Sequence, residues 1–177
     1  MKRYIAFLRG INVSGKNKIP MSELKVGFEE LGLTVVKTYL NSGNIAFSSN
    51  KEWDFSSQLK AMIKDKFALD IPVFVMPKEE LEDVLQNAPD WWGNENKEIY
   101  DNLIFIMPPA TFTEVFDKIG APKAEFETIK NYKKTVFWSF SRTDYQKTNW
   151  WSRTAHAGIR NMLTIRTANT VRKIVQM

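Results

Sequence analysis

The spacing of apolar and polar residues in the first half of the chain predicts short strands alternating with two-sided helices. The apolar run at residues 4–8 indicates a strand, and Met21, Leu24 and Phe28 lie at helical spacing. The predicted order is strand 4–8, helix 20–31, strands 34–40 and 45–49, a second helix, strand 71–76, and a third helix that opens at Pro77.

The second half repeats this order. The predicted elements are strand 102–107, a helix opened by a capping box at Thr111 and Glu114, strands 126–131 and 135–141, helix 149–162, strand 163–167 and a final helix. The β-α-β-β-α-β order is the split-βαβ, ferredoxin-like pattern. We therefore predict an α+β fold of duplicated split-βαβ units, each followed by an extra helix. The predicted domains are residues 1–88 and 98–177, joined by a linker rich in turn formers.

The two halves differ at one point, the connection between the first strand and the first helix. In the second half this connection is only Pro108-Pro109-Ala110, whereas in the first it runs from Arg9 to Pro20. Long loops inside small domains are usually functional or mobile. The Arg9–Pro20 insertion is therefore the first candidate for a binding site.

Composition removes several classes of protein. The chain has no cysteine, which excludes a disulfide, a thiolate nucleophile and a cysteine metal site. No apolar stretch is long enough to span a bilayer, and Met1-Lys-Arg leads directly into a strand. We expect a cytoplasmic protein without a membrane partner; its oligomeric state stays open.

Positive charge is concentrated at the two ends of the chain. The formal net charge is +5, residues 1–18 carry five lysines and arginines with no acid, and residues 128–177 carry ten against the single acid Asp144. Such a distribution favours attraction of phosphate-bearing partners, although solvated lysine and arginine are also ordinary solubilising residues.

The segment RGINVSGKN, residues 9–17, differs by one residue from the phosphate-binding loop of ATPases and GTPases. In that motif the lysine and the next Ser or Thr lie in the first turn of a helix, and the hydroxyl binds Mg²⁺. Here Asn17 has no hydroxyl, and Pro20 cannot lie inside a helix that starts at Lys16. We therefore predict that the chain has no ATPase-type loop.

A simpler anion site remains at the same place. In a split-βαβ unit, the end of the first strand and the turn between the second and third strands meet at one edge of the sheet. The predicted anion-binding residues are Arg9, Asn12, Lys16, Asn17, Lys18, Asn41, Ser42 and Asn44. The alternative is that residues 41–44 form only a turn and that the asparagines cap loop backbone.

The same stretches resemble a known family. Arg9-Gly-Ile-Asn-Val-x-Gly-Lys-Asn17, Met21-x-Glu-Leu24, Leu31-Gly32 and Ser42-Gly43-Asn44-Ile45-x-Phe47 are similar to the N-terminal signature of the domain of unknown function 1697 family. Members tend to carry Thr-x-Arg-Asn-Trp-Asn-Thr-Val near the C-terminus, where this chain has Thr167 and Ala168 in place of the usual Asn and Trp. The resemblance implies a small bacterial-type cytoplasmic protein and brings no agreed activity.

Other polar residues give weaker signals. Secondary anion-binding candidates near the C-terminus are Arg153, Arg160, Arg166, Asn169 and Thr170. The single histidine, His156, is predicted to lie on the surface of helix 149–162 with Arg153 and Arg160. Without a second histidine or a cysteine, we predict neither a metal site nor a cofactor. The third strand lacks the exposed aromatic run of RNA-reading ferredoxin-like folds.

Three functional hypotheses follow. The first is a binding protein for a phosphate-bearing ligand, with nucleic acid as the first candidate. The second is an enzyme acting on a small phosphorylated or carboxylated metabolite, with Arg9 or Lys16 stabilising negative charge. The third is a protein-interaction module that uses the Trp-rich segments around Trp91-Trp92 and Trp150-Trp151.

Overall fold

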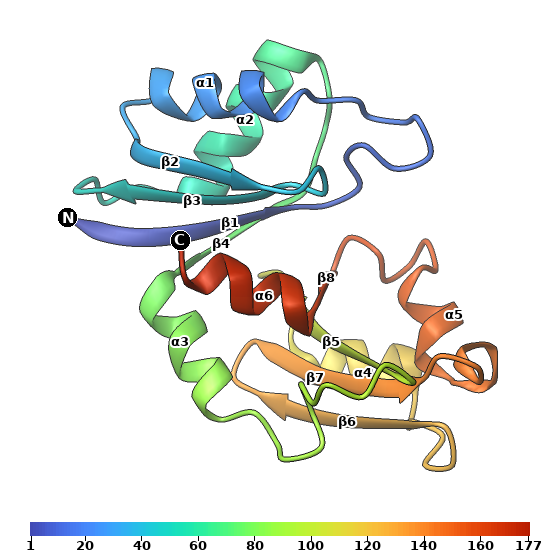
Figure 1. Cartoon of the computed structure of the whole chain (residues 1–177). Helices are drawn as coiled ribbons and strands as arrows, with labels where there is room; N and C mark the ends of the chain where they lie inside the picture. Colours follow the sequence, from blue (N-terminus) through green and yellow to red (C-terminus); the bar gives the residue numbers. More distant parts are fainter. The chain divides into compact units, whose positions relative to one another are not determined.

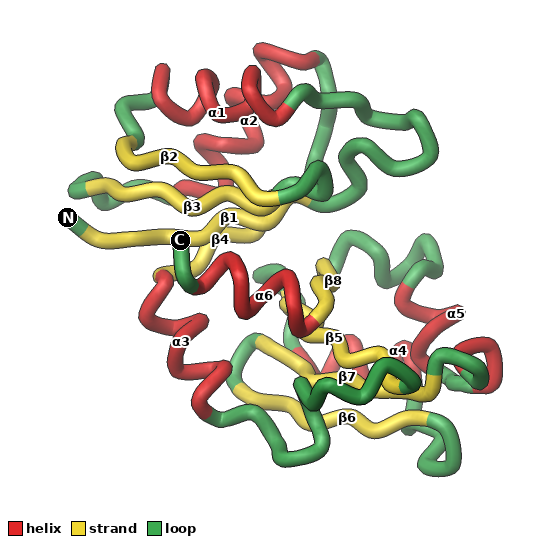
Figure 2. The backbone as a smooth tube through the Cα atoms, in the orientation of Figure 1, coloured by secondary structure: helices red, strands yellow, loops and turns green.

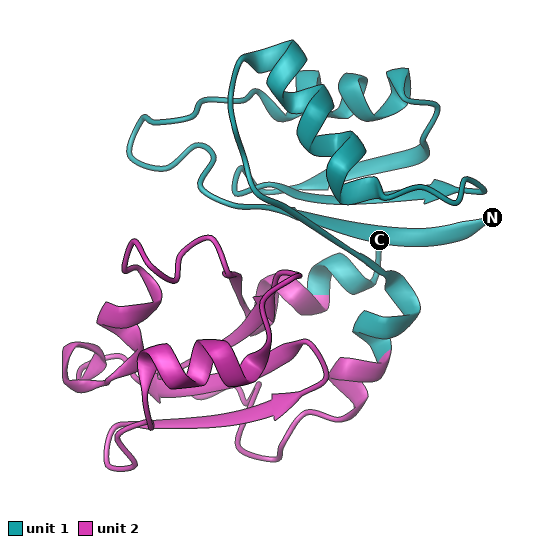
Figure 3. Cartoon of the chain, turned by 180° about the vertical axis from the view of Figure 1, so that it is seen from behind, with its two compact units in different colours: residues 1–82, 173–177 teal, residues 83–172 magenta.

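Two four-stranded antiparallel sheets form the framework, and the computed structural model describes residues 1–177. The chain divides into two units, residues 1–82 with 173–177 and residues 83–172 (Figure 3). Each sheet has the strand order of a split-βαβ unit, and an extra helix follows each β-α-β-β-α-β series. The predicted fold class is confirmed.

The first unit has the sheet order β2-β3-β1-β4, with α1 and α2 on one face (Figure 1). Its elements are β1 (Lys2–Leu8), α1 (Met21–Glu30), β2 (Thr34–Tyr39), β3 (Asn44–Ser49), α2 (Phe55–Phe67), β4 (Val73–Pro77) and the first half of α3 (Lys78–Gln86), whose residues from Asp83 onward belong to the second unit. Leu24 and Phe28 of α1 and Leu59 and Ile63 of α2 are fully buried in the core between the helices and the sheet. The apolar spacing seen in the sequence therefore marks the core-facing side of both helices.

The starts of these helices show how the sequence sets their boundaries. The Asp54 carboxylate caps α2, accepting hydrogen bonds from the Ser57 hydroxyl at 2.6 Å and the Ser57 amide at 3.2 Å. These bonds, chiefly that from the hydroxyl, lower the pKa of Asp54. Pro77 was predicted to open the third helix, but it ends β4, and α3 begins at Lys78. Its backbone is in register with Tyr4 of β1, so the strand continues through it.

The second unit has the sheet order β6-β7-β5-β8. Its elements are β5 (Ile99–Ile106), α4 (Phe112–Ile119), β6 (Glu127–Tyr132), β7 (Thr135–Ser141), the 3-10 helix η1 (Tyr145–Lys147), α5 (Trp150–Thr154), β8 (Leu163–Thr167) and the first part of α6 (Ala168–Val175), whose residues from Lys173 onward belong to the first unit. The capping box at Thr111 and Glu114 is present as predicted. The core between sheet and helices includes Trp138 and Trp150.

The predicted helix 149–162 is wrong in length. Helix α5 ends at Thr154, and the chain then forms successive turns, with the Ile159 amide donating to the His156 carbonyl at 3.0 Å. Gly158 lies in this stretch, and glycine costs about 1 kcal/mol relative to alanine inside a helix. Turns satisfy the backbone there while Ile159 is still buried.

A buried carboxylate holds the start of α5. Glu127 is 4% exposed and accepts hydrogen bonds from the Trp138 indole and from the backbone amides of Lys123, Asn149 and Trp150. A buried carboxylate needs several donors to replace its hydration. We assign Glu127 a structural role because these four groups belong to the protein itself.

Candidate functional site

The loop of residues 9–20, which we call the basic loop, leaves β1 and reaches α1 (Figure 2). Its tip is a small hairpin in which the Lys16 amide donates to the Val13 carbonyl at 2.9 Å. Ser14 and Gly15 have φ angles of +50° and +75°, as a two-residue type I′ turn requires. Helix α1 begins only at Met21. The ATPase-type arrangement, in which the lysine lies in the first turn of the helix, is absent.

Asn12 holds the basic loop in shape through three hydrogen bonds. Its Oδ1 accepts from the Ile19 amide at 2.8 Å, and its Nδ2 donates to the Ile19 carbonyl at 3.0 Å and the Asn41 carbonyl at 2.8 Å. The first two bonds close the loop on itself, and the third joins it to the turn between β2 and β3. The loop and the turn therefore lie together, as the split-βαβ topology predicts.

Gly43 brings the turn against β1. The Leu8 amide donates to the Gly43 carbonyl at 2.8 Å, and a Cβ at position 43 would lie 2.6 Å from Leu8 Cβ. Gly43 also has a φ of +88°, which disfavours any residue with a side chain. Only glycine fits this position without a shift of the backbone.

Two of the predicted anion-binding residues are exposed cations without a partner in the protein. Lys16 and Lys18 are exposed and take part in no side-chain hydrogen bond or ion pair. The side chain of Lys18 passes the tip of the loop, with its Cε 4.0 Å from the position a Cβ would take at Gly15. Arg9 is half-buried at the base of the loop, where its amide donates to the Pro72 carbonyl at 3.0 Å.

The asparagines and the serine of the predicted site divide into two groups. Asn17 donates to the Gly10 carbonyl at 2.9 Å, and the fully buried Asn44 donates to the Tyr39 carbonyl and the Ser42 hydroxyl, both at 2.9 Å. Together with Asn12, these residues support the backbone, as the alternative interpretation expected. Asn41 and Ser42 are exposed beside them.

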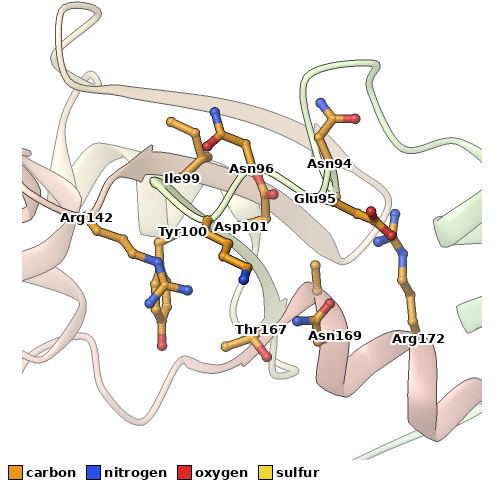
Figure 4. A pocket seen from close by; sticks show the side chains of 13 residues that line it. Asn94, Glu95, Asn96, Ile99, Tyr100, Asp101, Arg142, Thr167, Asn169 and Arg172 are labelled. Carbon is orange, nitrogen blue, oxygen red and sulfur yellow. The ribbon is translucent and has the colours of Figure 1, made fainter.

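The secondary candidates do not form one site. Arg153 and Arg160 are exposed, but they do not share a helix, because α5 ends between them. Arg166 is 8% exposed and donates to the Thr164 hydroxyl at 2.9 Å, and Thr170 is bonded to Thr167 at the start of α6. Asn169 differs from these residues, since it lines a pocket (Figure 4).

This pocket, which we call the polar pocket, lies in the second unit and has a volume of about 390 Å³. It forms because β8 ends at Thr167, opposite Asn102, so residues 99–101 of β5 have no strand on that side. The chain segment 93–97, Arg142 from beyond β7, and the start of α6 supply the rest of its lining. Part of this segment was predicted to be a linker, and Arg142 belongs to no motif in the sequence.

The charged residues that line the polar pocket are Arg142, Arg172, Lys97, Glu95 and Asp101. The Arg142 guanidinium lies 4.5 Å from the centre of the Tyr100 ring, and that of Arg172 lies 5.7 Å from the centre of the Trp92 ring. Neither guanidinium donates a hydrogen bond or forms an ion pair within the protein. Figure 4 shows them at opposite ends of the pocket, with Asn169 between them. Stacked guanidinium groups with unused donors are suited to binding phosphate or carboxylate.

The pocket also contains a largely buried carboxylate. Asp101 is 9% exposed and accepts a short hydrogen bond from the Ser139 hydroxyl. By the register of the two sheets, the same place in the first unit is taken by Arg3, which donates to Ser48 at 3.1 Å. Burial lowers the pKa of Arg3. The duplicated units therefore carry opposite charges at this position, and only the second combines a carboxylate with two unpaired arginines.

Asp83, another carboxyl group whose pKa is shifted, lies elsewhere in the second unit and has partners within the protein. Lys133 and Tyr132 donate to the Asp83 carboxylate at 2.6 and 2.9 Å, which lowers the pKa of Asp83 and raises that of Tyr132. No group of three histidine or acidic side chains is placed to hold a metal ion. The helices are too short or too polar to traverse a lipid bilayer.

The family model described as "Protein of unknown function (DUF1697)" matches residues 1–137. The chain belongs to this family. The conserved bacterial protein SP0830 from Streptococcus pneumoniae has a similar structure, with a TM-score of 0.81 and 32% sequence identity over 99% of this chain and 97% of that one. No curated protein matches the chain.

The structure explains part of the DUF1697 signature. Asn12, Gly43 and Asn44, which contribute to the resemblance, hold the basic loop and the adjoining turn in place. Their role is therefore local and architectural. Lys16, also within the signature, is different because its side chain takes part in no hydrogen bond or ion pair within the protein.

Proposed function

We propose that the chain binds a phosphate-bearing ligand through the basic loop, with nucleic acid as the ligand class. The observation that carries this proposal is the pair Lys16 and Lys18, two exposed cations without an intramolecular partner on a loop that Asn12 holds in one shape. A fixed loop loses little conformational entropy on binding. Exposed lysines are the side chains that neutralise the phosphates of a polymer.

Substitution of the loop lysines tests this proposal. We expect Lys16→Ala to weaken binding of a fluorescent duplex oligonucleotide at low salt, with a similar loss for unrelated base sequences, because phosphate contacts carry no base information. Lys64→Ala is the matched control, since Lys64 is an exposed and unpaired lysine on α2. Equal affinities for the two variants and the parent would refute a role for the loop.

The polar pocket supports a second candidate function, the binding or conversion of a small phosphorylated or carboxylated metabolite. The specific observation is the presence of two stacked guanidinium groups, those of Arg142 and Arg172, without a partner in the protein. We expect calorimetry to detect inorganic phosphate binding that Arg172→Gln abolishes. Lys130→Gln, which removes an exposed and unpaired lysine of the same unit, should leave it unchanged. Phosphate binding that both variants retain would exclude the polar pocket as the anion site.

A further inference from the structure

A second pocket in the same unit is lined almost entirely by aromatic rings. Tyr100, Phe140, Tyr145 and Trp151 line it together with Arg142, and its volume is about 360 Å³. We call it the aromatic pocket. It shares Tyr100 and Arg142 with the polar pocket, so the two pockets meet at these side chains.

Trp151 is the exposed wall of the aromatic pocket. It is 44% exposed, whereas its neighbour Trp150 is fully buried. Its ring meets the Tyr145 ring at 4.8 Å and 72° and the Phe140 ring at 5.7 Å and 69°, both edge-to-face contacts. These contacts fix the exposed indole in place. A fixed and solvated aromatic ring is suited to stacking against a flat partner.

Arg142 determines which flat partner fits. A cationic ligand, which aromatic pockets otherwise attract, would meet the guanidinium that lies over Tyr100. A planar ring that carries an anionic group has no such conflict, because the group can accept hydrogen bonds from the unused donors of Arg142. Each pocket is also within the size range of small-molecule sites, about 300–1,000 Å³.

We propose that the two pockets together form a nucleotide site, with the base in the aromatic pocket and the phosphate at Arg142, toward the polar pocket. This inference rests on the second candidate function, that the polar pocket binds an anion, and it adds the ligand class. The nucleotide can be a free nucleoside phosphate or one unit of a single strand, since both present a base and a phosphate. The site does not involve the basic loop.

The indole N–H signals of the tryptophans test where the base binds. We expect adenosine 5′-monophosphate to shift the Trp151 signal, identified by its loss in Trp151→Phe, while the Trp53 signal stays in place. Trp53 is a matched control because it is an exposed tryptophan, 38% accessible, in the first unit. Inorganic phosphate at the same concentration should leave the Trp151 signal unmoved. A deoxyadenosine octamer replaces the monophosphate in a parallel titration: tighter binding of the octamer identifies a strand as the source, and tighter binding of the monophosphate identifies a free nucleotide.

Affinity measurements on variants complete the test. Trp151→Ala should weaken binding of the tighter of the two probes by about 5- to 150-fold, the range expected for one stacked base, and Trp53→Ala should not. Arg142→Gln should weaken it as well, whereas Lys130→Gln should not. Because Arg142 is exposed, its variant stays informative if Trp151→Ala fails to fold.

Failure of this inference differs from failure of the second candidate function. If both probes bind no more tightly than phosphate and Trp151→Ala has no effect, the base does not occupy the aromatic pocket and the inference is wrong. Phosphate binding that still depends on Arg172 would then leave the second candidate intact. If phosphate, the monophosphate and the octamer all fail to bind, both are wrong.

Discussion

Replacement of Asn12 by alanine should destabilise the first unit through the loss of the three hydrogen bonds that hold the basic loop. At roughly 0.5–1.5 kcal/mol each, these bonds contribute about 1.5–4.5 kcal/mol. Asn12 also has a φ of +53°, where asparagine is tolerated and alanine costs about 1 kcal/mol more. We therefore expect Asn12→Ala to lower the free energy of unfolding by about 2.5–5.5 kcal/mol.

Urea denaturation followed by far-ultraviolet circular dichroism measures this loss, and hydrogen exchange locates it. The Ile19 amide donates to Asn12 Oδ1, so its exchange should accelerate in the variant. Asn50→Ala is the control, because Asn50 is exposed and its side chain takes part in no hydrogen bond in the protein. A loss below about 1 kcal/mol, no larger than for the control, would be less than the lowest contribution expected for three hydrogen bonds, about 1.5 kcal/mol. It would refute the conclusion that Asn12 fixes the loop.

Three further substitutions test other parts of the fold. Gly43→Ala should lower the free energy of unfolding, measured by denaturation, by about 2–4 kcal/mol, since it adds a steric clash to backbone strain. Gly10 has the same sign of φ but open space around it, so Gly10→Ala should cost only about 1 kcal/mol. Equal costs would contradict the packing of Gly43 against β1. Asp54→Ala should cost about 1 kcal/mol at neutral pH. Because folding lowers the pKa of Asp54, its contribution is complete above the unfolded-state pKa of about 3.9 and disappears as the pH falls through the folded-state pKa. A cost that does not decrease as the pH is lowered through this range would contradict the charged cap. Glu127→Ala should lower the free energy of unfolding by at least about 3 kcal/mol, because it leaves buried hydrogen-bond donors unpaired. Glu125 is exposed, so Glu125→Ala should change the stability very little. Similar Tm values for the two variants would refute the structural role of Glu127.

The duplicated fold could be predicted because each half repeats the same order of periodic segments and turn signals. The basic loop stood out for the same reason, as the place where the halves differ. The start of α4 could also be predicted, because the capping box at Thr111 satisfies the backbone amides at the start of that helix through nearby side chains. The end of α5 could not be predicted, since Trp151 and Ile159 have helical spacing although the chain turns after Thr154.

Predictions about side-chain roles were less complete than predictions about elements. Asn12, Asn17 and Asn44 were predicted either to bind an anion or to cap loop backbone, and the sequence could not decide between these roles; in the structure their amides bond to local backbone. The polar pocket was missed because Arg142 and Arg172 come from distant segments and match no motif. The pocket that both arginines line depends on where β8 ends, which is a property of the sheet.

The salt dependence of duplex binding tests the central claim most directly. We expect the logarithm of the association constant of the parent to fall linearly with the logarithm of the salt concentration, by about 0.9 for each phosphate contacted. The double variant Lys16→Ala/Lys18→Ala should make this slope shallower by the contribution of about two phosphate contacts. Lys64→Ala should leave the slope unchanged. If binding depends steeply on salt but the double variant does not change the slope, the nucleic-acid surface lies elsewhere on the protein. Absence of binding at low salt would contradict nucleic acid as the ligand.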